Sequence, residues 1–127
     1  MAKQRLGKEF IGVSLSWGTM REEDLIPVFV NALINAKRNE KVVLSSRTNL
    51  TLSDATNFIT EHREAFNYSG LPSDFNGLPS RYVDEARYIL SDLFDALDEI
   101  APKGCYFGAS LGDGSDFGFW EAEGPYF

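Results

Sequence analysis

The C-terminal region of the sequence contains a pattern that is typical of hydrolase nucleophiles. Residues 108–112 read GASLG and match G-x-S-x-G, in which Ser110 would attack a carbonyl carbon. In that motif the serine lies on a turn from a strand into a helix, and its histidine follows later in the chain. Here Ser110 leads into another glycine-rich turn, and the single histidine, His62, precedes it. We therefore expect no serine hydrolase.

The neighbouring residues offer two further kinds of chemistry. Asp113 and Asp116 lie in the glycine-rich segment GDGSD, and hard cations bind clustered oxygen ligands. Two carboxylates are too few for such a site, and aspartate is common in turns because its side chain accepts hydrogen bonds from nearby backbone N–H groups. Cys105 is the only cysteine, which excludes an intrachain disulfide and a cysteine zinc cluster.

We therefore expect no catalytic residues, no metal and no cofactor, and a protein that is not an enzyme. An enzyme with a metal at Asp113 and Asp116 is the third class of function, after two kinds of binding protein. That class predicts that a chelator changes the activity.

Charge is distributed unevenly along the chain. The 127 residues have a net charge of −7. Residues 1–63 carry nine basic and seven acidic side chains, whereas residues 64–127 carry three basic and twelve acidic ones. An acidic second half does not suit contact with a phosphate backbone, so we expect no direct binding of nucleic acid. It suits a basic protein partner, although acidic residues also serve solubility alone.

The acidic residues concentrate on a predicted helix at residues 80–100. At 100° per residue, its apolar side chains fall on one side. Six acidic residues fall on the other side and are the candidate partner-binding residues: Asp84, Glu85, Asp92, Asp95, Asp98 and Glu99. The alternative interpretation is that this side is only the solvated face of an amphipathic helix.

Aromatic residues are concentrated in a predicted C-terminal hairpin, with strands at 105–109 and 117–121. Phe117 and Phe119 share one face, while Trp120 takes the other, so both faces carry large rings. The rings on the second face would meet a helix, a second subunit of a homo-oligomer, or a flat ligand. A candidate site for a nucleotide-like ligand therefore consists of Trp17, Tyr106, Asp113, Asp116, Phe117 and Trp120.

Four further segments complete the predicted organisation. Alternating apolar residues predict a strand at 10–17. Thr19 and Glu22 have the form of a capping box at the start of a helix that ends near Arg38. Pro27 lies too deep for an undisturbed helix from Thr19, so a second segment would start near Asp24. For residues 42–44 the pattern indicates an edge strand or an ordered loop. Thr51 or Ser53 would cap a helix that continues to about residue 66. Residues 67–79 are expected to form a loop.

These elements predict one α+β domain over residues 1–127. A small antiparallel sheet of about three strands packs against two to three helices, with the long acidic helix directly before the C-terminal hairpin. The first strand pairs with the hairpin, because an isolated hairpin is only marginally stable. No stretch approaches the roughly 18 apolar residues of a membrane span, so we expect no membrane partner.

Two segments of the chain, SWGTMREEDLIP (16–27) and LFDALDEIAPKGCYFGASLGDGSDFGFWE (93–121), resemble a family of small uncharacterised proteins encoded by phages and plasmids. The most specific part is YFG followed by GDGSDFGFW. The resemblance carries over no activity and no catalytic residues. It implies an accessory role in a mobile element, a setting in which small acidic proteins often block host defence nucleases.

The sequence thus supports two functional hypotheses. In the first, a non-enzymatic acidic protein of a phage or mobile element inhibits a basic host defence or nucleic-acid-handling protein in the bacterial cytoplasm, as anti-CRISPR and anti-restriction proteins do, with nucleic-acid mimicry as one means. In the alternative, a protein that can be a homo-oligomer binds a nucleotide-like small molecule on its aromatic hairpin.

Overall fold

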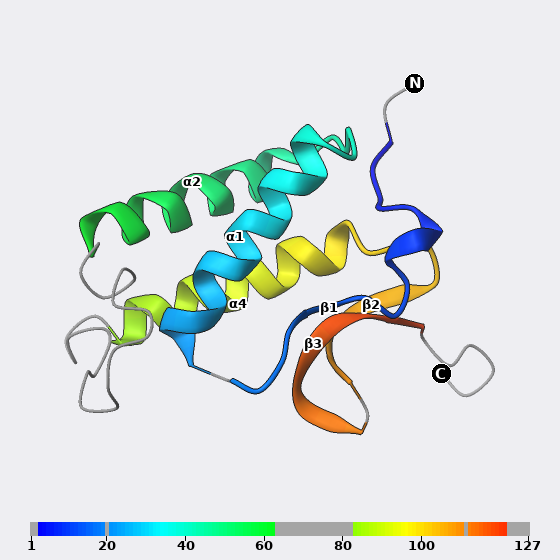
Figure 1. The fold of residues 1–127 in the computed structure, drawn as a ribbon. Coiled ribbons are helices and arrows are strands. Elements are labelled where there is room, and N and C mark those ends of the chain that lie inside the picture. The colour runs from blue at the N-terminus through cyan, green and yellow to red at the C-terminus, as the bar shows by residue number, and fades with distance from the viewer. Residues whose placement is uncertain (1–2, 20, 63–82, 111, 122–127) are drawn as a thin grey trace.

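The computed structural model describes residues 3–19, 21–62, 83–110 and 112–121 (Figure 1). Along the chain lie a short 3-10 helix at Lys8–Phe10, strand β1 at Ser14–Ser16, helices α1 at Glu22–Arg38, α2 at Ser46–Glu61 and α4 at Val83–Glu99, and strands β2 at Cys105–Ser110 and β3 at Asp113–Glu121. These elements confirm the predicted α+β fold with a small antiparallel sheet. No helix among the described residues combines the length and apolar character that a membrane crossing requires.

Helix α1 begins at Glu22, because the predicted capping box does not form. Thr19 Oγ1 donates to Asp24 Oδ2 at 2.6 Å and accepts a hydrogen bond from the Arg21 backbone N–H at 3.2 Å. Arg21 occupies the N-cap position without a side-chain hydrogen bond. The helix then continues through Pro27 to Arg38, as one helix rather than two segments. Pro27 lies in the second turn, where its missing N–H removes only one backbone hydrogen bond.

Helix α2 begins earlier than the sequence predicts. Ser45 is the N-cap, and its side chain accepts a hydrogen bond from the Thr48 backbone N–H at 3.1 Å. The predicted caps at Thr51 and Ser53 are therefore wrong, since both residues lie inside the helix. The polar composition of this stretch conceals its role, because Thr48 and Thr51 are buried. The predicted end at residue 66 lies outside the described residues.

Helix α4 confirms the predicted long amphipathic helix. Its apolar side includes the buried residues Ala86, Ile89, Leu93, Ala96 and Leu97. Residues 80–82 and the predicted loop at 67–79 lie outside the described residues. Residues 42–44 form a loop with one parallel bridge between Val42 and Lys3, rather than an edge strand.

The sheet has the order β1-β3-β2, with both pairings antiparallel, so the first strand pairs with the hairpin as predicted. The strand predicted at 10–17 shortens to Ser14–Ser16, because a 3-10 turn precedes it and Gly12 adopts a left-handed φ of 81°. Gly118 of β3 lets β1 approach closely, since a Cβ there would lie 2.3 Å from the Val13 carbonyl oxygen. In the hairpin, β3 begins at Asp113 and includes part of the predicted turn.

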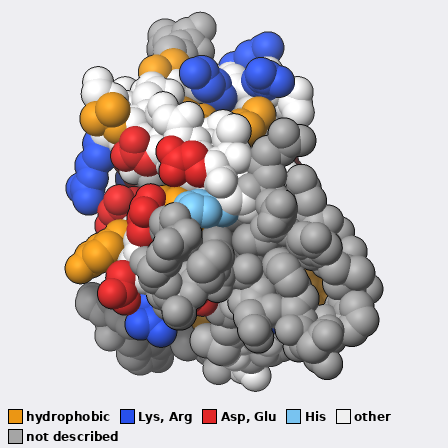
Figure 2. Space-filling model, turned by 90° about the vertical axis from the view of Figure 1, so that its left-hand side faces the viewer, with side chains coloured by type: hydrophobic (Ala, Val, Ile, Leu, Met, Phe, Trp, Pro, Cys, Tyr) orange, Lys and Arg blue, Asp and Glu red, His pale blue; other side chains and the backbone are white. Residues whose placement is uncertain are grey.

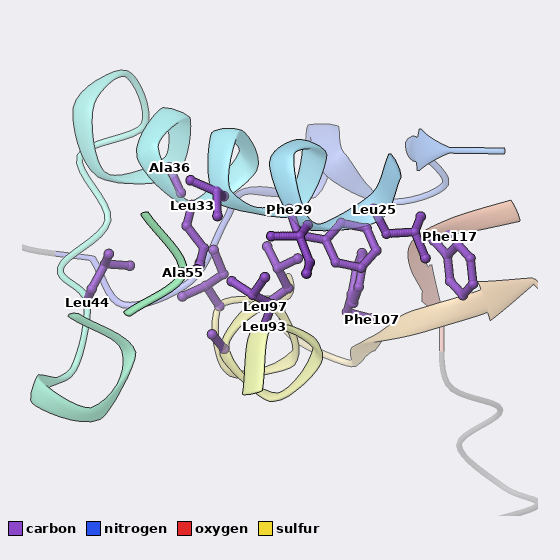
Figure 3. Close-up of a cluster of buried hydrophobic side chains, with 14 of the residues drawn as sticks. Leu25, Phe29, Leu33, Ala36, Leu44, Ala55, Leu93, Leu97, Phe107 and Phe117 are labelled. Atoms are coloured by element: carbon purple, nitrogen blue, oxygen red, sulfur yellow. The ribbon is translucent and has the colours of Figure 1, made fainter. Parts of the chain in front are cut away.

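The helices cover one face of the sheet, and a shared apolar core lies between them (Figure 1). Phe29 of α1 reaches the centre of this core, where its ring lies edge-on to Phe94 of α4 at 5.2 Å and to Phe107 of β2 at 5.1 Å between centroids. Figure 3 shows Leu93 and Leu97 of α4 and Ala55 of α2 in the same cluster. This core fixes α2 and α4 side by side, which positions the candidate site.

Candidate partner-binding site

The six acidic residues predicted on α4 have different surroundings. Residues seven positions apart share a side, because seven residues complete almost two turns. Glu85, Asp92 and Glu99 repeat at this spacing and line the side toward α2, where they border pockets shared with α2 residues. Asp84, Asp95 and Asp98 lie farther round the helix, although Asp95 still borders a pocket shared with α2 residues. The carboxylates of the predicted stripe therefore differ in their neighbours.

Two of the six carboxylates link α4 to neighbouring elements through hydrogen bonds. Asp98 Oδ1 accepts a hydrogen bond from the Phe107 backbone N–H of β2 at 3.0 Å. Glu99 Oε2 accepts hydrogen bonds from the hydroxyls of Thr48 at 2.8 Å and Ser45 at 3.2 Å. Both carboxylates lie in the last turn of α4, where the helix dipole disfavours negative charge. Their hydrogen bonds join α4 to β2 and to the start of α2, which gives them a structural role.

Two further carboxylates form ion pairs with arginines on the surface. Asp95 lies 3.7 Å from Arg47 of α2, and Asp84 lies 3.9 Å from Arg87 one turn along α4. All four side chains are largely exposed, so each pair contributes little to stability. The arginines nevertheless cancel much of the local negative charge of Asp84 and Asp95.

The remaining two, Glu85 and Asp92, line a groove between α2 and α4. The groove has a volume of about 380 Å³ and is also lined by two acidic residues of α2, Asp54 and Glu61. We call the site made by Asp54, Asn57, Phe58, Glu61, Glu85, Tyr88, Ile89 and Asp92 the acidic groove. Within the described part of the chain, no hydrogen bond or ion pair involves its four carboxylates. Figure 2 shows acidic side chains gathered on one face, with Lys and Arg toward its margins.

The register of the two helices places these four carboxylates in two opposed pairs. The helices run antiparallel, because the start of α2 contacts the end of α4 through Thr48 and Glu99. Counting from this contact in opposite directions brings Asp54 to within one residue of the level of Asp92, and Glu61 to within one residue of the level of Glu85. Each level of the groove thus carries one carboxylate from each helix, and we expect a repulsion between these like charges that a bound cation would relieve.

Sequence reasoning missed the contribution of α2 to this site. Asp54 and Glu61 belong to the half of the chain whose net charge is positive, and only folding brings them opposite the acidic helix. One signal in the sequence could have found them. They are seven residues apart, as are Glu85 and Asp92, so each helix presents two carboxylates on one side.

The candidate ligand residues of the hairpin are divided between the two faces of the sheet. Phe117 is buried in the core against Phe29 and Phe94. Tyr106 and Trp120 lie opposite each other across β2 and β3 on the outer face, where both are partly exposed. Phe117 therefore does not share a face with Trp120.

The two outer rings cover glycines of their own sheet. Trp120 Nε1 donates a hydrogen bond to the Gly108 carbonyl oxygen at 2.8 Å. A Cβ on Gly118 would lie 3.1 Å from the Trp120 ring, and one on Gly108 would lie 3.5 Å from the Tyr106 ring. Aromatic rings that pack over glycines in this way compensate for the missing side chains. The second set of rings thus has a local structural role.

The other candidate ligand residues are also placed separately. Trp17 follows β1 and is 70% exposed. Asp116 accepts a hydrogen bond from the Ser14 hydroxyl at 2.5 Å, which ties β3 to β1. Asp113 begins β3, and its backbone pairs with that of Ser110. The structure does not describe its side chain.

The structure gives no support for metal or thiol chemistry among the described residues. No three His, Cys, Asp or Glu side chains of the described ranges come together as metal ligands. Burial raises the pKa of the Cys105 thiol, and the nearby negative charge of Glu121 raises it further. A raised pKa keeps the thiol protonated near neutral pH and makes it a poor nucleophile.

Comparison of the chain with models of protein families, with curated proteins and with solved structures gave no match.

Proposed function

We propose that this protein is a non-enzymatic binding protein whose acidic groove binds a basic surface of a partner protein. One observation carries the proposal. Four carboxylates from two helices line the same groove and none of them pairs with a cation of the described residues, whereas the other candidate carboxylates of α4 are bonded to neighbouring residues. A basic partner would supply the missing positive charge.

Electrostatics supports this function through both rate and specificity. The carboxylates of α2 and α4 reinforce one another's field over the groove, and such fields accelerate the encounter with an oppositely charged protein. They also disfavour phosphate groups, in keeping with the expectation that nucleic acid is not bound directly. Binding by this mechanism weakens steeply as salt is added.

The resemblance to phage and plasmid proteins suggests the identity of the partner. Host defence and nucleic-acid-handling proteins carry basic surfaces that contact phosphate backbones. In this proposal, the protein acts in the cytoplasm of a bacterial host cell and inhibits such a protein by occupying its basic surface.

Charge reversal in the groove tests the proposal. The variant Asp54→Lys/Asp92→Lys reverses one opposed pair, and the control Glu9→Lys/Asp84→Lys makes the same change in net charge at exposed residues outside the groove. Tagged wild-type protein and both variants are used to capture proteins from a bacterial lysate at low and at high salt, with quantification by mass spectrometry.

We expect the wild type and the control to capture the same basic proteins at low salt, and the groove variant to lose them. Circular dichroism of all three proteins shows whether the fold is kept. If the folded groove variant captures the same proteins as the wild type, the acidic groove is not the binding site.

The alternative function, binding of a nucleotide-like ligand by the hairpin, rests on the partly exposed rings of Tyr106 and Trp120 on the outer face of the sheet. It has less support, because the Trp120 N–H is already bonded to Gly108. A thermal-shift screen with nucleotides tests it. A rise in melting temperature that grows with ligand concentration and disappears in Trp120→Ala would favour this function.

A further inference from the structure

The acidic groove has features of a docking site for a helix in addition to its charge. Its floor is apolar, because Phe58 of α2 and Ile89 of α4 line it and are 1% and 9% exposed. Tyr88 also lines the groove and is 74% exposed, although it is a large ring. An exposed ring beside an apolar floor favours contact with a partner's apolar side chain or with an arginine, which stacks on aromatic faces.

The carboxylates have a spacing that a helix matches. Asp54 and Glu61 are seven residues apart on α2, and Glu85 and Asp92 are seven residues apart on α4. With a rise of 1.5 Å per residue, the two levels of the groove are separated by roughly 10.5 Å along the helices. A third helix lying along the groove would present cationic residues at the same separation if they were also seven positions apart.

The other groove beside α4 lacks this complementarity. It lies between α1 and α4, has a volume of about 510 Å³ and is lined by Glu22, Arg87, Leu90, Ser91, Phe94 and Asp95. Arg87 lies 3.8 Å from Glu22 and supplies a cation within the groove itself. Its charges are mixed, so it provides no reason to select a basic partner. The acidic groove differs from it, because no cation of the described residues pairs with its carboxylates.

The carboxylate spacing also argues against imitation of a nucleic-acid backbone. Duplex DNA carries one phosphate charge per roughly 1.7 Å of its axis. The acidic groove offers two charges per level and levels that are several times farther apart. This sparse pattern resembles the spacing of side chains along a helix more than that of phosphates along a strand.

We infer that the occupant of the acidic groove is an amphipathic basic helix of the partner, with two arginines or lysines seven residues apart and an apolar residue between them. This inference rests on the proposed function and specifies the partner's element. One cation lies between Asp54 and Asp92, and the other lies between Glu61 and Glu85. The apolar residue rests on Phe58 and Ile89, and Tyr88 packs against the stem or guanidinium of a cationic side chain.

Two synthetic peptides of equal composition test the inference. Both are alanine-rich helices with two arginines and one leucine. In the matched peptide the arginines are seven residues apart with the leucine midway. In the mismatched peptide they are five residues apart, which turns the second arginine about 140° away from the first. Circular dichroism verifies equal helicity, and fluorescence anisotropy at low salt measures binding to the full chain.

We expect the matched peptide to bind at least about tenfold more tightly, since only it engages both levels of the groove. Tyr88→Ala should weaken the matched peptide severalfold, while Asp95→Asn on the neighbouring side of α4 should change its affinity little.

Equal affinity of the two peptides would overturn the helix inference, yet it would leave a basic partner in place. The helix inference would also be overturned if neither peptide binds while the wild type captures basic proteins that the groove variant loses. The proposed function would stand in that case. If neither peptide binds and the groove variant captures the same proteins as the wild type, both proposals fail.

Discussion

The contact between α2 and α4 has two halves that use similar side chains differently. In the half near the start of α2, Glu99 accepts hydrogen bonds from Ser45 and Thr48, and Arg47 pairs with Asp95. We call this the bonded half, in contrast to the acidic groove. In the acidic groove, four carboxylates line one groove at two levels and no described residue supplies a cation.

This difference separates carboxylates that stabilise the fold from those available for binding. A carboxylate that accepts two hydroxyl hydrogen bonds lowers the free energy of the folded state. Opposed carboxylates without a cation raise that free energy, and residues of this kind are typical of functional sites. Acidity alone does not distinguish the two groups, because both lie on the same side of α4.

The largest effect on stability is expected in the bonded half. Glu99→Ala removes the acceptor of two hydrogen bonds, and Thr48 is 1% exposed. We expect the free energy of unfolding to fall by about 1.5 kcal/mol, since hydrogen bonds to charged groups are stronger than average. Urea denaturation measures the change. A loss near zero would show that the bonded half contributes no more to stability than other surface charges.

A substitution in the acidic groove should change stability in the opposite direction. Asp92→Asn removes one of two opposed charges while keeping the side chain's shape. We expect a gain of about 0.5 kcal/mol at low salt that diminishes at high salt, because salt screens the repulsion. Asp84→Asn is the control and should give no gain, since Asp84 pairs with Arg87. Destabilisation by Asp92→Asn would contradict the repulsion assigned to the groove.

The smallest effect is expected from removing the cation of the bonded half. Arg47→Ala removes the partner of Asp95. Because the ion pair is exposed, the free energy of unfolding should fall by less than about 0.5 kcal/mol. The same change extends the unneutralised acidic surface toward the start of α2. We therefore expect the matched basic peptide to bind about twofold more tightly. Weaker binding to this variant would mean that the negative field does not drive association.

The sequence predicted α4 and β2 well and the starts of several other elements poorly. The periodicity of α4 and of β2 reports directly on burial, so both were predicted close to their observed positions, whereas β3 begins four residues before its predicted start. The start of α2 was missed because its buried residues there, Thr48 and Thr51, are polar. Strand β1 was predicted too long because alternation does not reveal the left-handed turn at Gly12.

The candidate site was only half visible in the sequence. All six acidic residues of α4 could be found from helical spacing, but their partners lie on other elements. Arg47, Thr48 and the Phe107 backbone engage three of them. The two acids that α2 adds to the groove come from the first half of the chain, whose net charge is positive. Tertiary packing, rather than local pattern, determines which carboxylates are bonded.

Chemical-shift mapping tests the account most directly. The matched basic peptide is titrated into isotopically labelled protein, and backbone amide resonances are followed by NMR. We predict that the largest shifts occur at Asp54, Glu61, Glu85, Tyr88 and Asp92, with little change at Thr48, Asp95 and Glu99. Shifts centred on Tyr106 and Trp120, or spread evenly over all acidic residues, would contradict the assignment of the acidic groove as the binding site.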